Sequence, residues 1–163
     1  MNIALIGFMA TGKTSVGKEL ARLRGMHYSD TDALIEQEAG ITISEIFNRY
    51  GEKYFRDLET KIISQSVQLD NQVITLGGGA VLRPENMDVL ERNSIIVCLT
   101  ATPEVIYERV KDDTTRPLLQ VPDPQAKIRE LLTQRAPYYQ RCNLMVDTSE
   151  LTIPQIVARI SVF

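Results

Sequence analysis

The stretch Gly7-Phe8-Met9-Ala10-Thr11-Gly12-Lys13-Thr14 follows a short apolar run and precedes a stretch of helical periodicity. It matches the pattern G-x-x-x-x-G-K-[ST] at every fixed position, in the strand–loop–helix context that the pattern requires. Glycines let the backbone turn tightly, so that successive N–H groups point at one anion, and the following helix adds the positive end of its dipole. The sequence therefore predicts a phosphate-binding loop in which Lys13 reaches the β- and γ-phosphates of a nucleotide and Thr14 is a magnesium ligand.

One position of this loop is unusual. Ala10 stands where many related loops carry another glycine. A methyl group is tolerable there on the condition that the backbone φ angle is negative. We expect ATP to contact the loop at Ala10, Thr11, Gly12, Lys13, Thr14 and Ser15.

Outward from the loop, short apolar runs alternate with longer stretches of helical periodicity. The runs are 3–6, 26–29, 73–76, 95–99 and 144–146, and the helical stretches are 13–24, 33–69 (broken near Gly40 and Gly51), 84–91, 103–111, 125–139 and 153–160. Four of the runs are continuously apolar, as is typical of parallel strands buried on both faces. The alternation predicts an α/β fold in which a five-stranded parallel sheet lies between two layers of helices.

Size and composition restrict the class of protein. A chain of 163 residues fits one domain over 1–163, and 44% hydrophobic with 24% charged residues argues against disorder. The formal charge of −3 argues against binding nucleic acid through bulk electrostatics. No apolar stretch approaches ~18 residues, so we expect no membrane span. The first residues lack the basic region and cleavage site of a secretory signal, and we expect a soluble, cytoplasmic protein.

Cysteine and histidine offer no metal site. Cys98 and Cys142 lie far apart and outside any CxxC pattern, and His27 is the sole histidine of the sequence. We therefore expect no zinc site and no disulfide framework. Cys98 lies in an apolar run and is predicted to be buried, and His27 is predicted to be structural.

Two aspartates, Asp30 and Asp32, follow the second apolar run. In an extended segment, residues i and i+2 point to the same side, so both carboxylates are expected to face the edge where α/β sheets bind ligands. One would hold Mg²⁺ through water, and the other would accept a hydrogen bond from a hydroxyl group. Helix capping is the alternative, because aspartate is a common N-cap. Asp147, after the last run, is predicted to cap a turn with Thr148 and Ser149.

Six segments occur in an order that resembles the shikimate kinase family, in the nucleoside-monophosphate-kinase-like branch of P-loop kinases. Besides the loop, they are DTD at 30–32, FRDLE at 55–59, LGGGAV at 76–81, RPLL at 116–119 and RAPYY at 135–139. The resemblance covers essentially the whole chain. It implies the strand order 2-3-1-4-5, a shikimate-binding region over about 31–60 and a small lid over about 112–124. The lid segment is rich in proline and aspartate, and this composition predicts a mobile loop.

The resemblance also implies an activity and the roles of individual residues. ATP and shikimate would react, with Mg²⁺, to give ADP and shikimate 3-phosphate in aromatic amino acid biosynthesis. The implied catalytic residues are Lys13, Asp32 and Arg116. Asp32 would hold ring hydroxyls, Asp30 would support Mg²⁺ through water alongside Thr14, and Arg56 and Arg135 would clamp the substrate carboxylate. The backbone of Gly77, Gly78 and Gly79 would contact the substrate, Arg116 would reach the ATP phosphates, and Arg109 and Pro154 would flank adenine.

The residue types agree with these roles. Planar guanidinium groups suit a carboxylate, and a run of glycines lets the backbone approach a small ring closely. Arg56 and Glu59 are spaced i, i+3, so Glu59 could orient Arg56 on one helical face. Tyr138 and Tyr139 are predicted to pack rather than to take part in chemistry.

Three other functions are compatible with parts of the pattern. A gluconate kinase also accepts a polyhydroxy acid. An adenylate-type kinase needs a larger pocket for its second nucleotide, and the short lid here has no cysteine cluster. The absence of Asp32, Arg56 or Arg135 would favour a non-catalytic nucleotide-binding module, but all three residues are present. We expect a monomer, because no long apolar stripe is left unassigned.

Overall fold

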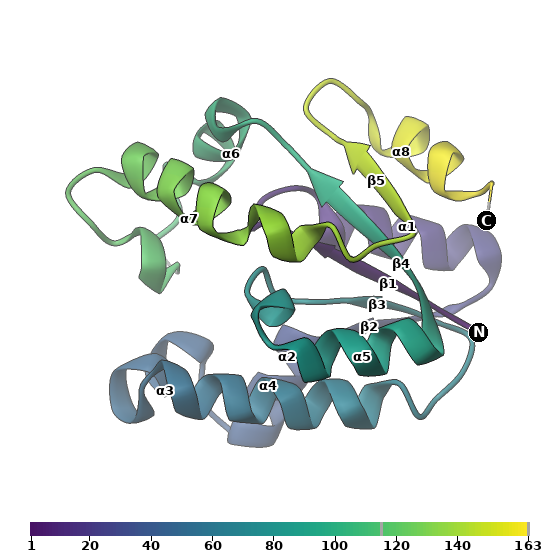
Figure 1. Cartoon of the computed structure of the whole chain (residues 1–163), viewed down its shortest axis with the longest axis horizontal. Helices are drawn as coiled ribbons and strands as arrows, with labels where there is room; N and C mark the ends of the chain where they lie inside the picture. Colours follow the sequence, from purple (N-terminus) through teal and green to yellow (C-terminus); the bar gives the residue numbers. More distant parts are fainter. Residues whose placement is uncertain (115, 163) are drawn as a thin grey trace.

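A five-stranded parallel sheet with the order β2-β3-β1-β4-β5 organises the protein (Figure 1). The computed structural model describes residues 1–114 and 116–162. The strands are β1 (Asn2–Gly7), β2 (His27–Asp30), β3 (Gln72–Thr75), β4 (Ser94–Thr100) and β5 (Leu144–Asp147). The predicted fold class and strand order are confirmed.

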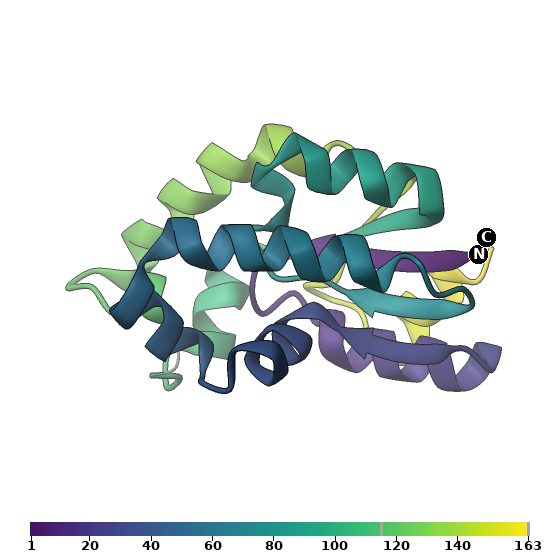
Figure 2. The ribbon, with the colours of Figure 1, turned by 90° about the horizontal axis from the view of Figure 1, so that it is seen from below.

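Helices cover both faces of this sheet (Figures 1 and 2). They are α1 (Lys13–Arg24), α2 (Thr31–Ala39), α3 (Ile43–Tyr50), α4 (Glu52–Ser66), α5 (Pro84–Asn93), α6 (Pro103–Val110), α7 (Pro124–Tyr139) and α8 (Ile153–Ile160), with short 3₁₀ helices at Ala80–Leu82 and Pro117–Leu119. Proline stands in the first turn of α5, α6, α7 and α8. A missing N–H costs nothing there, because the first N–H groups of a helix have no partner within it.

The central strand β1 shows why the two faces have separate cores. Its side chains alternate: Ile3 and Leu5 pack with α1 and α8, whereas Ala4 and Ile6 pack with α4, α5 and α7. All of these side chains are buried, as expected for a parallel strand covered on both faces. β1 therefore ends, at Gly7, in the middle of the carboxyl edge of the sheet.

A third, smaller core lies beside the sheet, where α2, α3 and α4 pack together. Its buried members are Ile35, Ile46, Phe55 and Ile62. The predicted helical stretch 33–69 is thus three helices, with breaks at Gly40 and Gly51 as expected. A capping box between Thr42 and Glu45 starts α3. This unit contains the region of about 31–60 that the family resemblance implies for shikimate binding, and that role stays a prediction.

The segment predicted as a lid, 112–124, joins α6 to α7. It contains the 3₁₀ helix Pro117–Leu119, and the buried Leu119 packs into the core that α4, α5 and α7 share. Asp123, near the end of the segment, caps α7, because its Oδ1 accepts a hydrogen bond from the Ala126 N–H over 3.1 Å. The segment is anchored at both of these points, and its movement stays a prediction. Thr115 lies outside the described residues.

In the part of the chain that the structure describes, no helix is long and apolar enough to span a membrane.

Candidate active site

Two adjoining cavities lie at the carboxyl edge of the sheet. The larger has a volume of about 560 Å³ and reaches α2, α3, α4 and α7, and the smaller, of about 280 Å³, lies against the phosphate-binding loop. Both are lined by Met9, Asp32, Gly77, Gly78 and Arg116. A molecule in one cavity would therefore adjoin a molecule in the other, which is the arrangement that group transfer requires.

The smaller cavity is formed by the predicted phosphate-binding loop. Lys13, at the start of α1, extends its ammonium group beneath the loop and donates to the carbonyl oxygens of Gly7 (2.7 Å) and Phe8 (2.8 Å). Loss of surrounding water lowers the pKa of Lys13 to about 8, and the nearby Asp32 carboxylate opposes this shift. Gly12, Thr14 and Ser15 also line the cavity. The loop thus presents a cation and a helix N-terminus to one space, as anion binding requires.

The conformation of Ala10 contradicts our expectation. Its φ angle is +60°, in the left-handed region, whereas the methyl group was expected to require a negative φ. Such a conformation costs of order 1–3 kcal/mol in a residue with a side chain and persists where the surroundings impose it. Here the Arg109 guanidinium donates to the Ala10 carbonyl oxygen over 2.7 Å, and the Thr148 hydroxyl lies 2.9 Å from the Thr11 carbonyl oxygen.

Thr148 anchors this loop, a role that the sequence did not reveal. Its buried hydroxyl lies 2.9 Å from the carbonyl oxygens of both Thr11 and Thr100, so it links the loop to the end of β4. Asp147 does cap a turn as predicted, since it accepts a hydrogen bond from the Ser149 N–H over 2.9 Å. The contact joins a threonine after β5 to a loop near the N-terminus, and the two segments are neighbours in the fold but not in the sequence.

The two residues predicted to flank adenine lie at different places. Arg109, on α6, lies behind the loop and also approaches Thr148, with 3.4 Å between Nη2 and the Thr148 carbonyl oxygen. Pro154 is exposed in the first turn of α8. Neither residue lines the two cavities described above. Their contact with adenine stays a prediction.

Asp30 and Asp32 lie in a different conformation from the one predicted. Asp30 ends β2 and is the N-cap of α2, and its Oδ1 accepts a hydrogen bond from the Asp32 N–H over 2.9 Å. Asp32 is therefore in the first turn of a helix, and the expectation that an extended segment aligns the two carboxylates is wrong. Both nevertheless line the smaller cavity, so Asp30 serves as a cap and as a cavity residue. Burial and the Asp30 carboxylate raise the pKa of Asp32.

Arg56 and Glu59 lie on one face of α4, as their spacing predicts. Arg56 Nη1 donates to Glu59 Oε1 over 2.9 Å, and Nη2 lies 3.4 Å from Glu52 Oε1 at the surface. Both Arg56 and Glu59 are buried, and burial raises the pKa of Glu59 to about 7 although Arg56 acts to lower it. Arg56 is thus held in one orientation along the wall of the larger cavity.

The triple glycine after β3 allows the closest approaches in the site. A side chain on Gly79 would collide with the Arg56 guanidinium, whose Nη2 lies 2.2 Å from the position that a Cβ would take. A Cβ on Gly78 would lie 3.4 Å from Nη1 of Arg135, which reaches the cavity from α7 and is itself buried. The two guanidinium groups therefore flank one short piece of backbone.

The third arginine, Arg116, lies between the two cavities and lines both. Its Nε is 3.3 Å from Asp113 Oδ2, and the side chain is 39% exposed. Arg116 is also near enough to Lys13 to lower the pKa of that ammonium group. The structure thus brings Lys13, Asp32 and the three arginines (Arg56, Arg116 and Arg135) together, as the sequence predicted.

The oxygen groups of the smaller cavity suit a magnesium ion. The Thr14 hydroxyl and the Asp30 carboxylate both line it, and Mg²⁺ prefers oxygen ligands of this kind. Among the described residues, no three or more His, Cys, Asp or Glu side chains gather as a metal site.

Comparison with known proteins agrees with this geometry. The family model described as "Shikimate kinase" matches residues 9–162. A shikimate kinase of Thermodesulfovibrio yellowstonii is 48% identical over 98% of this chain and 92% of its own length. A shikimate kinase of Geobacter sulfurreducens is 44% identical over 99% of this chain and 90% of its own.

Solved structures extend the likeness to three dimensions. The structure of an Acinetobacter baumannii shikimate kinase in complex with shikimate superposes with a TM-score of 0.95, at 36% identity over 98% of this chain and 90% of that one. A gluconokinase of Sinorhizobium meliloti, at 17% identity and a TM-score of 0.59 over 96% of this chain and 87% of that one, shares the fold alone. By its sequence, its fold and the residues around its two cavities, this chain belongs to the shikimate kinase family.

Proposed function

We propose that the protein transfers the γ-phosphoryl group of ATP to the 3-hydroxyl of shikimate, giving ADP and shikimate 3-phosphate. One observation carries the choice of acceptor: Asp32, Arg56 and Arg135 meet around a cavity that adjoins the phosphate-binding loop. Shikimate offers one carboxylate and three hydroxyls. A pair of guanidinium groups and a carboxylate are the groups that complement it.

The nucleotide phosphates would lie in the smaller cavity. The loop N–H groups, the start of α1 and Lys13 would bind the β- and γ-phosphates. Thr14 and Asp30, the latter through water, would hold Mg²⁺. When bound with ATP, the ion would neutralise part of the negative charge of the phosphates.

In the transfer step, the 3-hydroxyl oxygen bonds to the γ-phosphorus while the bond to the β,γ-bridging oxygen breaks. Asp32 orients the hydroxyl group and is placed to accept its proton. Lys13 and Arg116 offset the negative charge that spreads over the transferred oxygens, because both line the smaller cavity, where the phosphates would lie. In a loose transition state, positioning and charge neutralisation carry most of the rate enhancement.

The lid segment 112–124 would bring Arg116 fully over the phosphates when both substrates are bound. Closure would exclude water and so prevent wasteful hydrolysis of ATP. An arginine on a moving segment makes transfer conditional on closure.

A coupled assay of ADP release with shikimate, gluconate or AMP as the acceptor tests the proposal. We expect turnover with shikimate alone. Turnover with gluconate or AMP and none with shikimate would overturn the choice of acceptor and leave the phosphate-binding loop intact. ATP hydrolysis that no acceptor stimulates would favour a nucleotide-binding module without transfer activity.

The chain itself supplies every residue assigned to the site, so we propose that it acts as a monomer. Cys98 and Cys142 are free thiols, which accords with the reducing conditions of the cytoplasm.

A further inference from the structure

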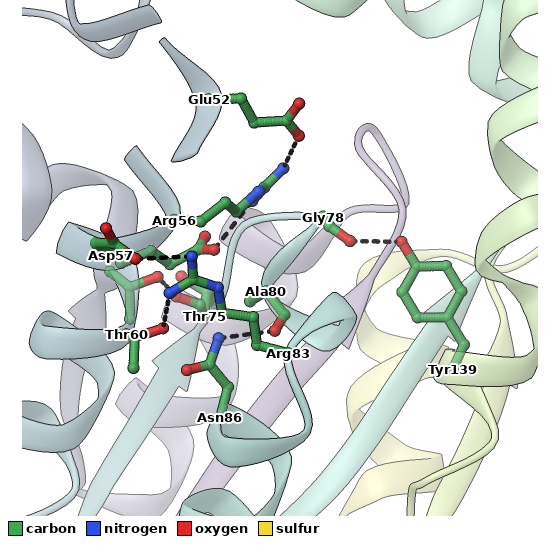
Figure 3. A network of polar contacts seen from close by, with 12 residues as sticks. Glu52, Arg56, Asp57, Thr60, Thr75, Gly78, Ala80, Arg83, Asn86 and Tyr139 are labelled. Carbon is green, nitrogen blue, oxygen red and sulfur yellow. Dashed lines mark hydrogen bonds and ion pairs between the residues drawn. The ribbon is translucent and has the colours of Figure 1, made fainter. Parts of the chain in front are cut away.

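Tyr139, on α7, contacts the glycine turn that follows β3 (Figure 3). It lies in the last turn of α7, is 6% exposed and packs in the core that α4, α5 and α7 share. Its hydroxyl donates to the Gly78 carbonyl oxygen over 2.6 Å. The sequence predicts a packing role for Tyr139, but packing alone does not require its hydroxyl group.

The other carbonyl groups of this turn are also bonded. The Gly77 and Gly79 carbonyl oxygens accept hydrogen bonds from the N–H groups of Ala80 and Leu82, each over 3.1 Å. Asn86 donates to the Ala80 carbonyl oxygen over 2.9 Å. The hydrogen bond from Tyr139 therefore fixes the orientation of the peptide group between Gly78 and Gly79. Neither glycine has a side chain that could fix this orientation.

The orientation of that peptide decides where the Gly79 N–H points. In a planar trans peptide, the carbonyl group and the following N–H point in opposite directions. Because the Gly78 carbonyl oxygen points at the Tyr139 hydroxyl, the Gly79 N–H points away from that hydroxyl, and Gly79 itself lines the larger cavity. Within residues 1–114 and 116–162, no backbone carbonyl oxygen accepts a hydrogen bond from this N–H.

The surroundings of this N–H suit an anion. The Arg56 guanidinium lies against Gly79, and Arg135 lies against the neighbouring Gly78. A donor between two fixed cations is complementary to a carboxylate or to a hydroxyl beside one. A carboxylate has room for about four hydrogen bonds, so two guanidinium groups leave capacity for a backbone donor.

We propose that Tyr139 is a positioning residue for the acid substrate, which it serves by aiming the Gly79 N–H into the cavity between Arg56 and Arg135. This inference rests on the proposed function, since it assumes that shikimate occupies that cavity. Arg135 and Tyr139 lie four residues apart on α7. In this proposal Arg135 contacts the substrate, and Tyr139 orients the backbone beside it.

The hydroxyl stays a donor throughout the working range of pH. Burial raises the pKa of Tyr139 to about 12, with the Arg135 guanidinium acting in the opposite direction. The bond to Gly78 therefore does not depend on a change of protonation.

Tyr139→Phe tests the proposal, because it removes the hydroxyl and keeps the ring. Tyr138→Phe is the matched control: the same change at the neighbouring position, where the side chain is 42% exposed. For Tyr139→Phe we expect the KM for shikimate to rise about tenfold, on the scale of one lost hydrogen bond. We expect kcat and the KM for ATP to change less than twofold, and Tyr138→Phe to match the parent protein.

A second measurement reports on the backbone itself. In the ¹⁵N-labelled parent protein, titration with shikimate should move the amide resonance of Gly79, and the movement should be smaller in Tyr139→Phe. Equal KM values in the two variants, or an unmoved Gly79 amide at saturating shikimate, would overturn the role of Tyr139.

Two further outcomes separate this inference from other causes. If Tyr139→Phe weakened shikimate and ATP binding together and lowered Tm, the hydroxyl would be a support of the fold, and the proposal would fail. If the parent protein bound no shikimate at all, the proposed function itself would be wrong. If the parent protein turned over shikimate and Tyr139→Phe had the same KM, this inference alone would be overturned.

Discussion

Arg56 and Glu59 form an ion pair inside the protein, with 2.9 Å between Arg56 Nη1 and Glu59 Oε1 and with both side chains buried. The pair occupies one face of α4, so the helix itself sets the spacing of the two groups. Arg56 has a second carboxylate partner, Glu52, at the surface. The two partners differ in burial, and this difference allows their contributions to be separated.

Glu59→Gln should weaken shikimate binding far more than Glu52→Gln does. Glutamine at 59 leaves Arg56 without its buried counter-charge, so the guanidinium loses its fixed orientation. We expect the KM for shikimate to rise at least about tenfold, the scale of a hydrogen bond to a charged group. Glu52 is 52% exposed, and its pair with Arg56 is screened by water, so Glu52→Gln should change KM less than twofold. Equal effects of the two changes would contradict the positioning role of Glu59.

Glu59 also makes stability depend on pH. Its pKa rises from the usual 4.5 to about 7 in the folded protein because of burial. Between these values the folded state binds more protons than the unfolded state, so this carboxyl group contributes less to the free energy of unfolding as pH rises. In urea unfolding across this window, the stability of the parent protein relative to Glu59→Gln should fall with rising pH. A constant difference would show that the group does not titrate there.

Lys13→Ala should lower kcat at least ~10²-fold, the scale of a lost transition-state donor. The ammonium group lies beneath the loop, where it would contact the β- and γ-phosphates. Lys18, one turn further along α1, is exposed over the Tyr28 ring and is a suitable control. Steady-state rates of ADP release for Lys13→Ala and Lys18→Ala provide the comparison. Near-normal turnover of Lys13→Ala would remove the loop from the mechanism.

Arg116→Ala should lower kcat and leave shikimate binding intact. Arg116 is the partly exposed member of the three arginines, on the predicted lid, and would act on the phosphates after closure. Single-turnover rates and a shikimate titration monitored by calorimetry would separate the two effects. Arg129→Ala, which breaks a surface pair with Glu104, is the control and should alter neither. Loss of shikimate affinity at full kcat would place Arg116 in the acid clamp instead.

Ala10→Gly should stabilise the protein, because glycine adopts a φ of +60° without the strain that alanine bears. The added freedom of the unfolded chain offsets part of the gain, so we expect an increase of about 0.5–1 kcal/mol in the free energy of unfolding. Ala158→Gly, on the exposed face of α8, should have the opposite effect, a loss of about 1 kcal/mol. Denaturant unfolding of both variants tests the sign, and destabilisation by both would mean that Ala10 is not strained.

Where local sequence decides which element forms, prediction from the sequence succeeded, although the φ angle expected for Ala10 within the phosphate-binding loop was wrong. The phosphate-binding loop, the breaks at Gly40 and Gly51, and the pairing of Arg56 with Glu59 all depend on residues within a few positions of one another. The strand order followed from a family resemblance that the fold confirmed. The Asp30–Asp32 pair shows the limit: a strand ended one residue later than expected, and its last residue capped a helix.

The sequence by itself determined which chemical groups this protein has and the local elements that carry them, because helical and strand periodicity, caps and glycine turns are properties of neighbouring residues. Only the tertiary structure decided how distant groups hold the backbone of the site. Thr148 bonds to Thr11 across 137 positions, and Tyr139 bonds to Gly78 across 61. No pattern in the chain marks such pairs, since both acceptors are backbone carbonyl oxygens, which every residue possesses.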